Sequence, residues 1–212
     1  MKVLWIIPGI DSGSSMIFAK RQCQDLQKFG VNGDMFFLGS KQDPLSLYRT
    51  FRSALRFGRE SGVTCVHAQY GTFTAFFSSI LAFMLGARLF ITCRGSDINY
   101  CPADGFFRNI LQKFCTYFAS LTASQIFVVS EELKNKFWWK WKTIIVTPSG
   151  VNFEEFKPLV RATCRERLVW SASEKIILFN AGKTPRLKRI DLAVAAINIL
   201  KQSNENVRLE IL

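Results

Sequence analysis

Hydrophobic residues follow two patterns along the chain: short continuous runs, and longer stretches in which they recur every three or four residues. Short apolar runs bounded by turn residues are typical of buried strands, whereas the three-to-four spacing is typical of amphipathic helices. The runs predict strands over residues 2–7, 34–38, 63–67, 88–93, 125–130, 144–146, 176–179 and 207–212. The helical spacing predicts helices over residues 16–29, 45–59, 73–87 and 106–120, and two more that begin at 131 and at 190.

Strands and helices therefore alternate through the chain, which predicts an α/β fold with a parallel sheet covered on both faces. Ligands of such sheets bind at the carboxyl ends of the strands. The loops of interest follow Ile7, His67, Cys93, Ser130, Val146 and Ala181.

A polar segment of mixed charge, residues 153–173, interrupts this alternation. We place a domain boundary there and predict one domain over residues 1–158 and the start of another over residues 173–212. The second is expected to be incomplete, because residues 207–212 are predicted as a strand with no helix after it.

The stretch over residues 176–191 combines an apolar strand, a glycine, a basic loop and the start of a helix. A helix N-terminus offers unpaired N–H groups and partial positive charge, and basic side chains add full charges. This pattern favours a diphosphate-binding loop around Gly182, Lys183 and Lys188. The alternative is a solvated basic loop in which Gly182 only forms the turn.

The amino-acid composition restricts the possible binding partners of the protein only in part. The 212 residues carry a formal net charge of +12, which attracts nucleic acid, anionic lipid or phosphorylated substrates without choosing among them. The six cysteines form no C-x-x-C pair and there is one histidine, which argues against a zinc site and favours reduced, buried thiols in a cytosolic protein.

Two apolar regions, the start of the chain and residues 73–87, could be mistaken for membrane-inserted segments, but neither predicts membrane insertion. Pro8 and Asp11 interrupt the apolar start, so it does not resemble a secretory signal. The uncharged residues 73–87, at about 1.5 Å per residue, fall short of the roughly 30 Å hydrocarbon core, so a buried helix is expected.

Several short motifs share an order along most of the chain. They are Gly13-Ser14-Ser15, Val66–Gly71, Thr92–Ile98, Val128–Ser130, Pro148–Asn152 with Phe156–Pro158, and Gly182-Lys183 with Lys188. Each is weak alone, but together they resemble the family-four glycosyltransferases, which are retaining enzymes of the GT-B architecture with two Rossmann-like domains.

The resemblance implies that the second domain binds a nucleotide-sugar donor. We expect no cofactor and no metal. Lys183 and Lys188, beside Gly182, would contact the donor phosphates and stabilise the nucleoside diphosphate leaving group. The family usually has arginine where Lys183 stands, and lysine supplies charge without a bidentate fork. Gly13 and Ser14 would lie near the donor phosphates or the acceptor.

The resemblance also implies that the first domain binds a glycan or lipid-linked acceptor. The catalytic candidates are His67, Arg94 and Asp97. The family often has histidine where Arg94 stands; arginine cannot act as a general base, but it can clamp an anionic group. Alternatively, His67 could simply hydrogen-bond within the core and Asp97 could cap a turn. Ser149 replaces the asparagine that the family has in its Pro-Asn-Gly motif.

The family's E-x7-E motif, whose last glutamate binds the donor ribose, would lie beyond Leu212, so we expect this chain alone to transfer no sugar. Two other hypotheses stay open: a basic nucleic-acid-binding protein, although no recognisable reader element is present, and a non-catalytic remnant of a glycosyltransferase.

A cluster of tryptophans alternating with lysines over residues 136–142 suits a membrane interface. With the four arginines between residues 49 and 59, it predicts a cytoplasmic protein that rests peripherally on the inner, anionic face of a membrane. The alternative is a partly buried aromatic cluster with solvated lysines.

Overall fold

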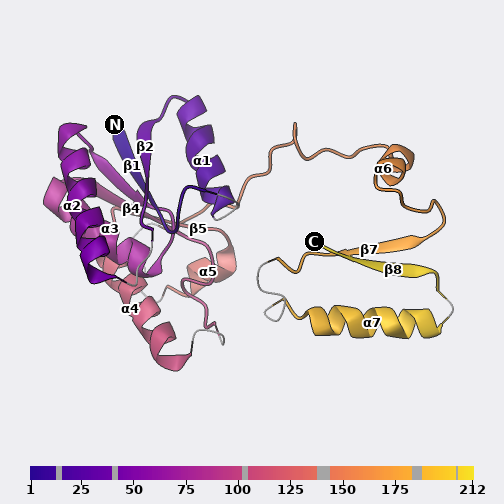
Figure 1. Cartoon of the computed structure of the whole chain (residues 1–212). Helices are drawn as coiled ribbons and strands as arrows, with labels where there is room; N and C mark the ends of the chain where they lie inside the picture. Colours follow the sequence, from indigo (N-terminus) through magenta and orange to yellow (C-terminus); the bar gives the residue numbers. More distant parts are fainter. Residues whose placement is uncertain (13–15, 40–42, 102–104, 138–143, 183–187, 204) are drawn as a thin grey trace. The chain divides into compact units, whose positions relative to one another are not determined.

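The structure is a computed structural model that describes residues 1–12, 16–39, 43–101, 105–137, 144–182, 188–203 and 205–212. The chain forms two compact units, Met1–Gly150 and Val151–Leu212, and each is described by itself (Figure 1). The roles predicted for the two domains, acceptor side and donor side, stay predictions.

The first unit is built on a parallel sheet of six strands in the order β2-β1-β3-β4-β5-β6. The strands are β1 (Lys2–Ile7), β2 (Asn32–Phe37), β3 (Cys65–Ala68), β4 (Arg88–Cys93), β5 (Gln125–Val128) and β6 (Ile144–Val146). The strand order reverses between β1 and β3. In doubly wound sheets a crevice forms at such a point, outside the carboxyl ends of the strands.

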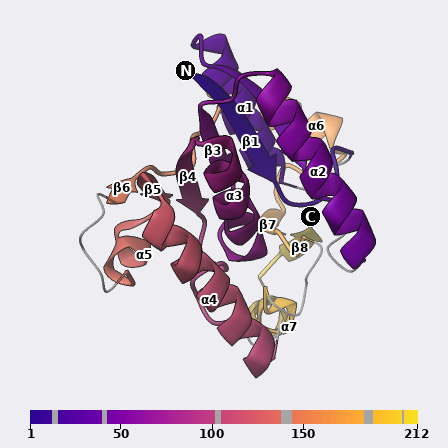
Figure 2. The same cartoon turned by 90° about the vertical axis from the view of Figure 1, so that its left-hand side faces the viewer.

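Right-handed crossovers place the helices on both faces of this sheet. The helices are α1 (Ile17–Lys28), α2 (Pro44–Glu60), α3 (Thr72–Leu85), α4 (Phe106–Thr122) and α5 (Glu131–Asn135). In Figure 1, α1 lies on one side of the sheet and α2 and α3 lie on the other. Figure 2 looks onto that second side, where α3 packs against both α2 and α4.

Alternate residues of β1 supply two separate cores, as the period of two in a strand requires. Leu4 and Ile6 pack on the side of α2, α3 and α4, whereas Val3, Trp5 and Ile7 pack on the side of α1. Both cores are apolar, so the sheet is covered on both faces as predicted.

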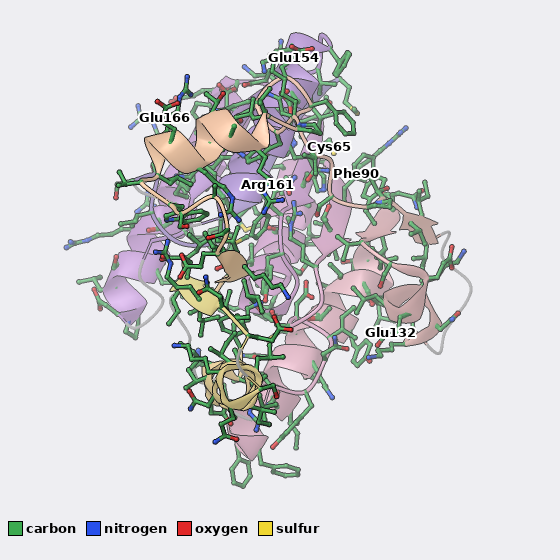
Figure 3. The ribbon with its side chains drawn as sticks, turned by 90° about the vertical axis from the view of Figure 1, so that its right-hand side faces the viewer. Cys65, Phe90, Glu132, Glu154, Arg161 and Glu166 are labelled. Carbon is green, nitrogen blue, oxygen red and sulfur yellow. The ribbon has the colours of Figure 1, made fainter. Side chains whose placement is uncertain are left out.

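The second unit contains α6 (Arg161–Arg167), β7 (Lys175–Phe179), α7 (Ile190–Gln202) and β8 (Val207–Ile211). The two strands pair in parallel, with Lys175 opposite Val207. The predicted parallel strand is confirmed, but its predicted burial is wrong, because Ile177 and Leu178 are exposed in a described sheet of only two strands. Helix α6 was not predicted, since it is short, polar and without a buried residue; Figure 3 shows its Arg161 and Glu166.

The helix predicted over residues 73–87 is α3, but it is buried on one side only, because Ile80, Phe83 and Met84 are exposed. Among the described residues, no helix has both the length and the apolar character needed to span a bilayer.

The six cysteines are free thiols. Cys23, Cys65, Cys93 and Cys115 are buried, whereas Cys101 and Cys164 are partly exposed. Burial raises the pKa of Cys23 to about 12 and that of Cys65 to about 11. These thiols are therefore uncharged at neutral pH.

Candidate functional site

Two loops meet at the carboxyl edge of the sheet, close to the point where the strand order reverses. β3 lies between β1 and β4, with Ala68 opposite Ile6 on one side and Ile91 on the other. The loop after β3, Gln69–Gly71, is therefore a neighbour of the loop after β4, Arg94–Asp97.

The Asp97 side chain joins the two loops. Its carboxylate is only 1% exposed. Oδ2 accepts a hydrogen bond from the backbone N–H of Gly71 (2.9 Å), and Oδ1 accepts from those of Arg94 (3.0 Å) and Gly95 (2.7 Å). Because its oxygens are already bonded to the backbone, this geometry favours the capping role of Asp97 over the predicted catalytic role.

The start of α3 depends on the same network. The Thr72 N–H donates to Thr116 Oγ1 of α4 (2.7 Å), and that hydroxyl donates to the carbonyl oxygen of Asp97 (3.0 Å). A Cβ on Gly71 would lie 2.8 Å from Asp97 Cβ and 2.9 Å from Thr116 Oγ1. Only glycine fits there, since such distances are shorter than normal van der Waals contact.

The Arg94 guanidinium is held at this edge by side chains from α1 and from the loop after β3. Nη2 donates to Gln22 Oε1 and to Gln69 Oε1, both at 2.7 Å, and Nε donates to the Gln69 carbonyl oxygen at 3.3 Å. Its Cζ lies 4.6 Å from the centre of the Phe18 ring, within the range of a cation–π interaction. The cation is therefore fixed in orientation by uncharged groups.

Burial lowers the pKa of Arg94, and the Asp97 carboxylate opposes that shift. The side-chain nitrogen of Gln69 is buried and has no hydrogen-bond partner among the described residues. The partly exposed Arg94 guanidinium can bind an anionic oxygen, whereas the Gln69 amide is enclosed and serves to hold Arg94.

A second cation lies near the end of β1. Lys20 of α1 is buried, donates to the carbonyl oxygen of Asp11, and has its Nζ 3.4 Å from Asp11 Oδ1 and 5.2 Å from the centre of the Phe37 ring. Lys20, Gln22 and Phe18 were not predicted as site residues, and Gln69 was noted only as part of the motif Val66–Gly71. The spacing of Phe18 and Gln22, one helical turn apart in the helix after β1, was the available signal.

His67 lies inside β3 rather than in the loop. Its Nε2 is 2.8 Å from Thr92 Oγ1, and its ring contacts Phe90 and Phe127. Burial, and secondarily the charge of Arg94, lower its pKa to about 3. His67 is therefore neutral at pH 7 and a weak base, which favours the core interpretation over the predicted catalytic role.

Only two of the five predicted donor-binding residues, Gly182 and Lys188, lie among the described residues. Gly13, Ser14 and Lys183 lie outside the described residues, as do the tryptophans of residues 138–141. Gly182 and Lys188 belong to the second unit, and both are exposed. Gly182 adopts a left-handed conformation, with φ of 53°, and its N–H donates to the Leu212 carbonyl oxygen.

The N-terminus of α7 already carries a carboxylate. Arg189 Nη2 lies 2.8 Å from Asp191 Oδ2, and this hydrogen bond lowers the pKa of Asp191. A phosphate at this helix end would share it with Asp191, so the lysines of the loop would have to supply most of the attraction.

No protein-family model matches the sequence, and no curated protein matches it. Solved structures do match over the whole chain. MurG of Acinetobacter baumannii is 16% identical with a TM-score of 0.52, and the match covers 100% of this chain and 66% of MurG. A UDP-GlcNAc 2-epimerase of Neisseria meningitidis, bound to UDP-GlcNAc, is 14% identical with a TM-score of 0.62, covering 100% of this chain and 66% of the epimerase.

A glycosyltransferase of Rickettsia africae is 14% identical with a TM-score of 0.61, and the match covers 99% of this chain and 68% of that protein. This chain thus spans about two thirds of the length of the proteins it resembles. Identities this low bear on the fold alone. The chain has an α/β fold of the GT-B type, with a Rossmann-like parallel sheet in its first unit.

Proposed function

We propose that this chain belongs to a glycosyltransferase that moves a sugar from a nucleotide-sugar donor to a glycan or lipid-linked acceptor. Residues 1–158 would form the acceptor side, and residues 173–212 would begin the donor side. The structural neighbours support this proposal, since they include a glycosyltransferase and an enzyme bound to UDP-GlcNAc. The short-motif resemblance to family-four glycosyltransferases supports the same reaction, with retention of configuration.

The observation that carries the proposal is the fixed guanidinium of Arg94 at the carboxyl edge of the sheet. In the reaction, the bond from the anomeric carbon to the diphosphate oxygen breaks, a bond to an acceptor hydroxyl oxygen forms, and the hydroxyl proton passes to an oxygen of the departing diphosphate. Negative charge grows on the departing diphosphate. A cation oriented beforehand by Gln22 and Gln69 stabilises such charge without reorganisation, or binds an anionic group of the acceptor.

The remaining candidates take different roles. Asp97 positions the Arg94 loop through its backbone hydrogen bonds, and His67 supports the core beneath it. Lys183 and Lys188 are proposed to bind the donor phosphates from the second unit. The protein is proposed to act in the cytoplasm, at the inner face of a membrane.

The test is transfer of labelled sugar from a panel of nucleotide sugars to glycan and lipid-linked acceptors, with the protein at the length its gene encodes. We expect Arg94→Ala to lower turnover by about 100-fold or more, because the loss of one oriented donor of this kind typically costs that much. Arg94→Lys should recover part of the rate, because it keeps the charge but not the planar fork.

Lys28→Ala is the matched control, since Lys28 is exposed at the far end of α1 and pairs with Asp25. Turnover within twofold of wild type in Arg94→Ala would contradict the role of Arg94. Epimerised nucleotide sugar formed without any acceptor would favour an epimerase instead. Oligonucleotide binding that falls steeply with salt, with no sugar turnover, would favour the nucleic-acid alternative.

A further inference from the structure

Helix α4 exposes a broad apolar face. Its large exposed side chains are Phe106, Phe107, Ile110, Leu111, Phe114, Phe118 and Leu121, and Phe107 is 85% exposed. At 100° per residue these positions span about 140° of the helix surface. The opposite side, with Asn109, Cys115, Thr116 and Ala119, is buried. The helix is therefore apolar on a side that the rest of the first unit leaves uncovered.

This face continues onto α3. Phe76, Ile80 and Phe83 recur at intervals of four and three, so they follow one line along α3. The Phe76 ring centre lies 5.5 Å from that of Phe118, and Phe118 in turn stacks on Phe114 at 6.2 Å. Phe83 is 87% exposed. The two helices thus form one continuous apolar ridge, and contiguous apolar surfaces of this kind mark interaction sites.

The start of α4 is an ordered structure. Asn109 accepts a hydrogen bond from the Cys101 N–H and donates to the carbonyl oxygens of Cys101 and Gly105. These bonds fix the first turn of α4, where Phe106 and Phe107 project. Since α4 follows β4, this end lies at the same carboxyl edge of the sheet as Arg94.

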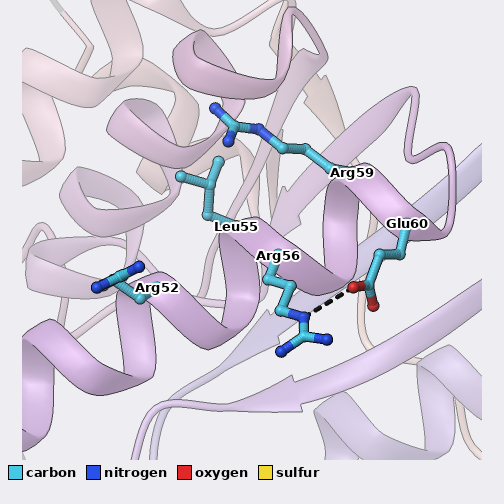
Figure 4. Close-up of a pocket in the computed structure, with 5 residues that line it drawn as sticks. All are labelled: Arg52, Leu55, Arg56, Arg59 and Glu60. Atoms are coloured by element: carbon cyan, nitrogen blue, oxygen red, sulfur yellow. Dashed lines mark hydrogen bonds and ion pairs between the residues drawn. The ribbon is translucent and has the colours of Figure 1, made fainter.

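Basic residues outnumber acidic ones around the ridge. Helices α3 and α4 contain no acidic residue, and α4 carries Arg108 and Lys113. Helix α2, which packs against α3, contains four arginines and one glutamate. Figure 4 shows the groove on α2 that Arg52, Leu55, Arg56, Arg59 and Glu60 line, with Arg56 paired to Glu60 at 2.7 Å. Phosphate headgroups are the complementary partner for such cations.

We propose that the α3–α4 ridge inserts into the interfacial layer of an anionic lipid bilayer, while the arginines of α2 bind headgroup phosphates. Aromatic side chains beside basic ones, without acidic neighbours, are the composition that interfacial helices use. The face that α4 exposes is wider than the a/d seam of a coiled coil, so it is not built to pair with a single helix in that way. Docking in this way would present the carboxyl edge of the sheet to lipid-linked molecules. The inference stands on the surface alone and does not require the proposed sugar transfer.

The test is flotation of the purified chain with two kinds of vesicle, one of phosphatidylcholine alone and one with about a third of phosphatidylglycerol. We expect binding to the anionic vesicles that weakens with added salt. The double variant Phe107→Gln and Leu111→Gln should lower the partition coefficient at least about tenfold, because two large apolar groups are lost from the buried face. Arg52→Gln with Arg59→Gln should lower binding to anionic vesicles and reduce its salt dependence.

Phe29→Gln is the matched control, since Phe29 is 88% exposed but lies at the end of α1, on the other face of the sheet. It should bind like wild type. Circular dichroism of each variant checks beforehand that it is folded. The proposal is overturned if the wild type binds neither vesicle, or if the Phe107 and Leu111 variant binds as well as wild type. Self-association in sedimentation velocity that this variant abolishes, without vesicle binding, would assign the ridge to a second copy instead.

Discussion

The loop after β4 and the loop after β7 each combine a glycine with basic side chains between a strand and a helix, but the residues that the structure describes in these loops differ in their contacts. In the first, the Asp97 carboxylate binds three backbone N–H groups and two glutamines orient Arg94. In the second, the Gly182 N–H bonds to the end of β8, and Lys188 is exposed. A local pattern therefore does not determine whether a cation is fixed in place; neighbouring elements do.

The largest effect should follow removal of the carboxylate that joins the loops. Asp97→Ala leaves three N–H groups without acceptors, one of them buried and two partly buried, and we expect the free energy of local opening to fall by about 3 kcal/mol or more. Hydrogen exchange of peptides covering β3, β4 and their loops measures this directly.

Asp191→Ala removes a carboxylate at the exposed start of α7 and should leave the protection of that unit nearly unchanged, because water replaces the lost contacts. Equal effects of the two substitutions would show that the two loops are supported in the same way.

A smaller loss should follow Gly71→Ala. The new methyl would press on Asp97 and Thr116 at distances under 3.0 Å and separate the two loops. We expect a destabilisation of about 2 kcal/mol, as for other overpacked sites. Urea unfolding followed by circular dichroism provides the measurement. Gly150→Ala, where a Cβ would meet nothing within 4 Å, is the control, and a neutral Gly71→Ala would show that the loops can move apart freely.

Acid should weaken the first unit through His67. Its pKa in the folded state is about 3, below the ordinary value of about 6.5, so the unfolded chain binds more protons below pH 6.5. The stabilising contribution is therefore complete above pH 6.5 and falls as the pH drops toward 3, amounting to a loss of about 2 kcal/mol by pH 5. The second unit contains no histidine and lacks this dependence.

Urea unfolding of wild type and His67→Gln at pH 7.5, 6 and 5 separates this contribution from that of the carboxylates, which both proteins share. The wild type should lose about 2 kcal/mol more than the variant over that range. Parallel pH profiles would mean that His67 can be protonated without disturbing the fold.

The smallest change in stability is expected for Lys188→Gln, less than about 0.5 kcal/mol, because the side chain is exposed. If the proposed donor role is correct, nucleotide-sugar affinity measured by calorimetry should nevertheless fall roughly tenfold. Lys201→Gln, at the other end of α7, should affect neither quantity. A stability loss above about 1 kcal/mol would contradict the assignment of Lys188 to a solvated loop.

The sequence was sufficient for most elements of the fold, because most strands contain a short apolar run and each long helix has an apolar line. The start of β2, residues 32–34, is not apolar, and the prediction placed that strand two residues too late. Strands β1, β4 and β6 begin and end where predicted, whereas α6 was missed because it has no apolar line to detect. Apolar spacing also did not distinguish a buried face from an exposed one. Helix α4 buries a side of small and polar residues, among them Asn109, Thr116 and Ser120, and exposes its large apolar side chains, which is the reverse of what an apolar line predicts.

The site was predictable in position but not in its contacts. Arg94 and Asp97 follow a strand, and strand ends carry sites in such folds. Their partners are distant in sequence: Asp97 binds Gly71 across 26 residues, and Arg94 binds Gln22 across 72. The order of the strands in the sheet brings these residues together, and local sequence patterns do not encode that order. His67 was chosen for its chemistry, although its place inside β3 makes it part of the core.

Each unit has one partly exposed cysteine that can be labelled chemically. Cys101 belongs to the first unit and Cys164 to the second, and both are partly exposed, whereas the other four are buried. Alkylating reagents react with accessible thiolates, so at neutral pH they should modify Cys101 and Cys164 well before the buried thiols. A donor and an acceptor dye at these two natural positions would report the distance between the units in solution, and whether a nucleotide sugar changes it, without any engineered cysteine.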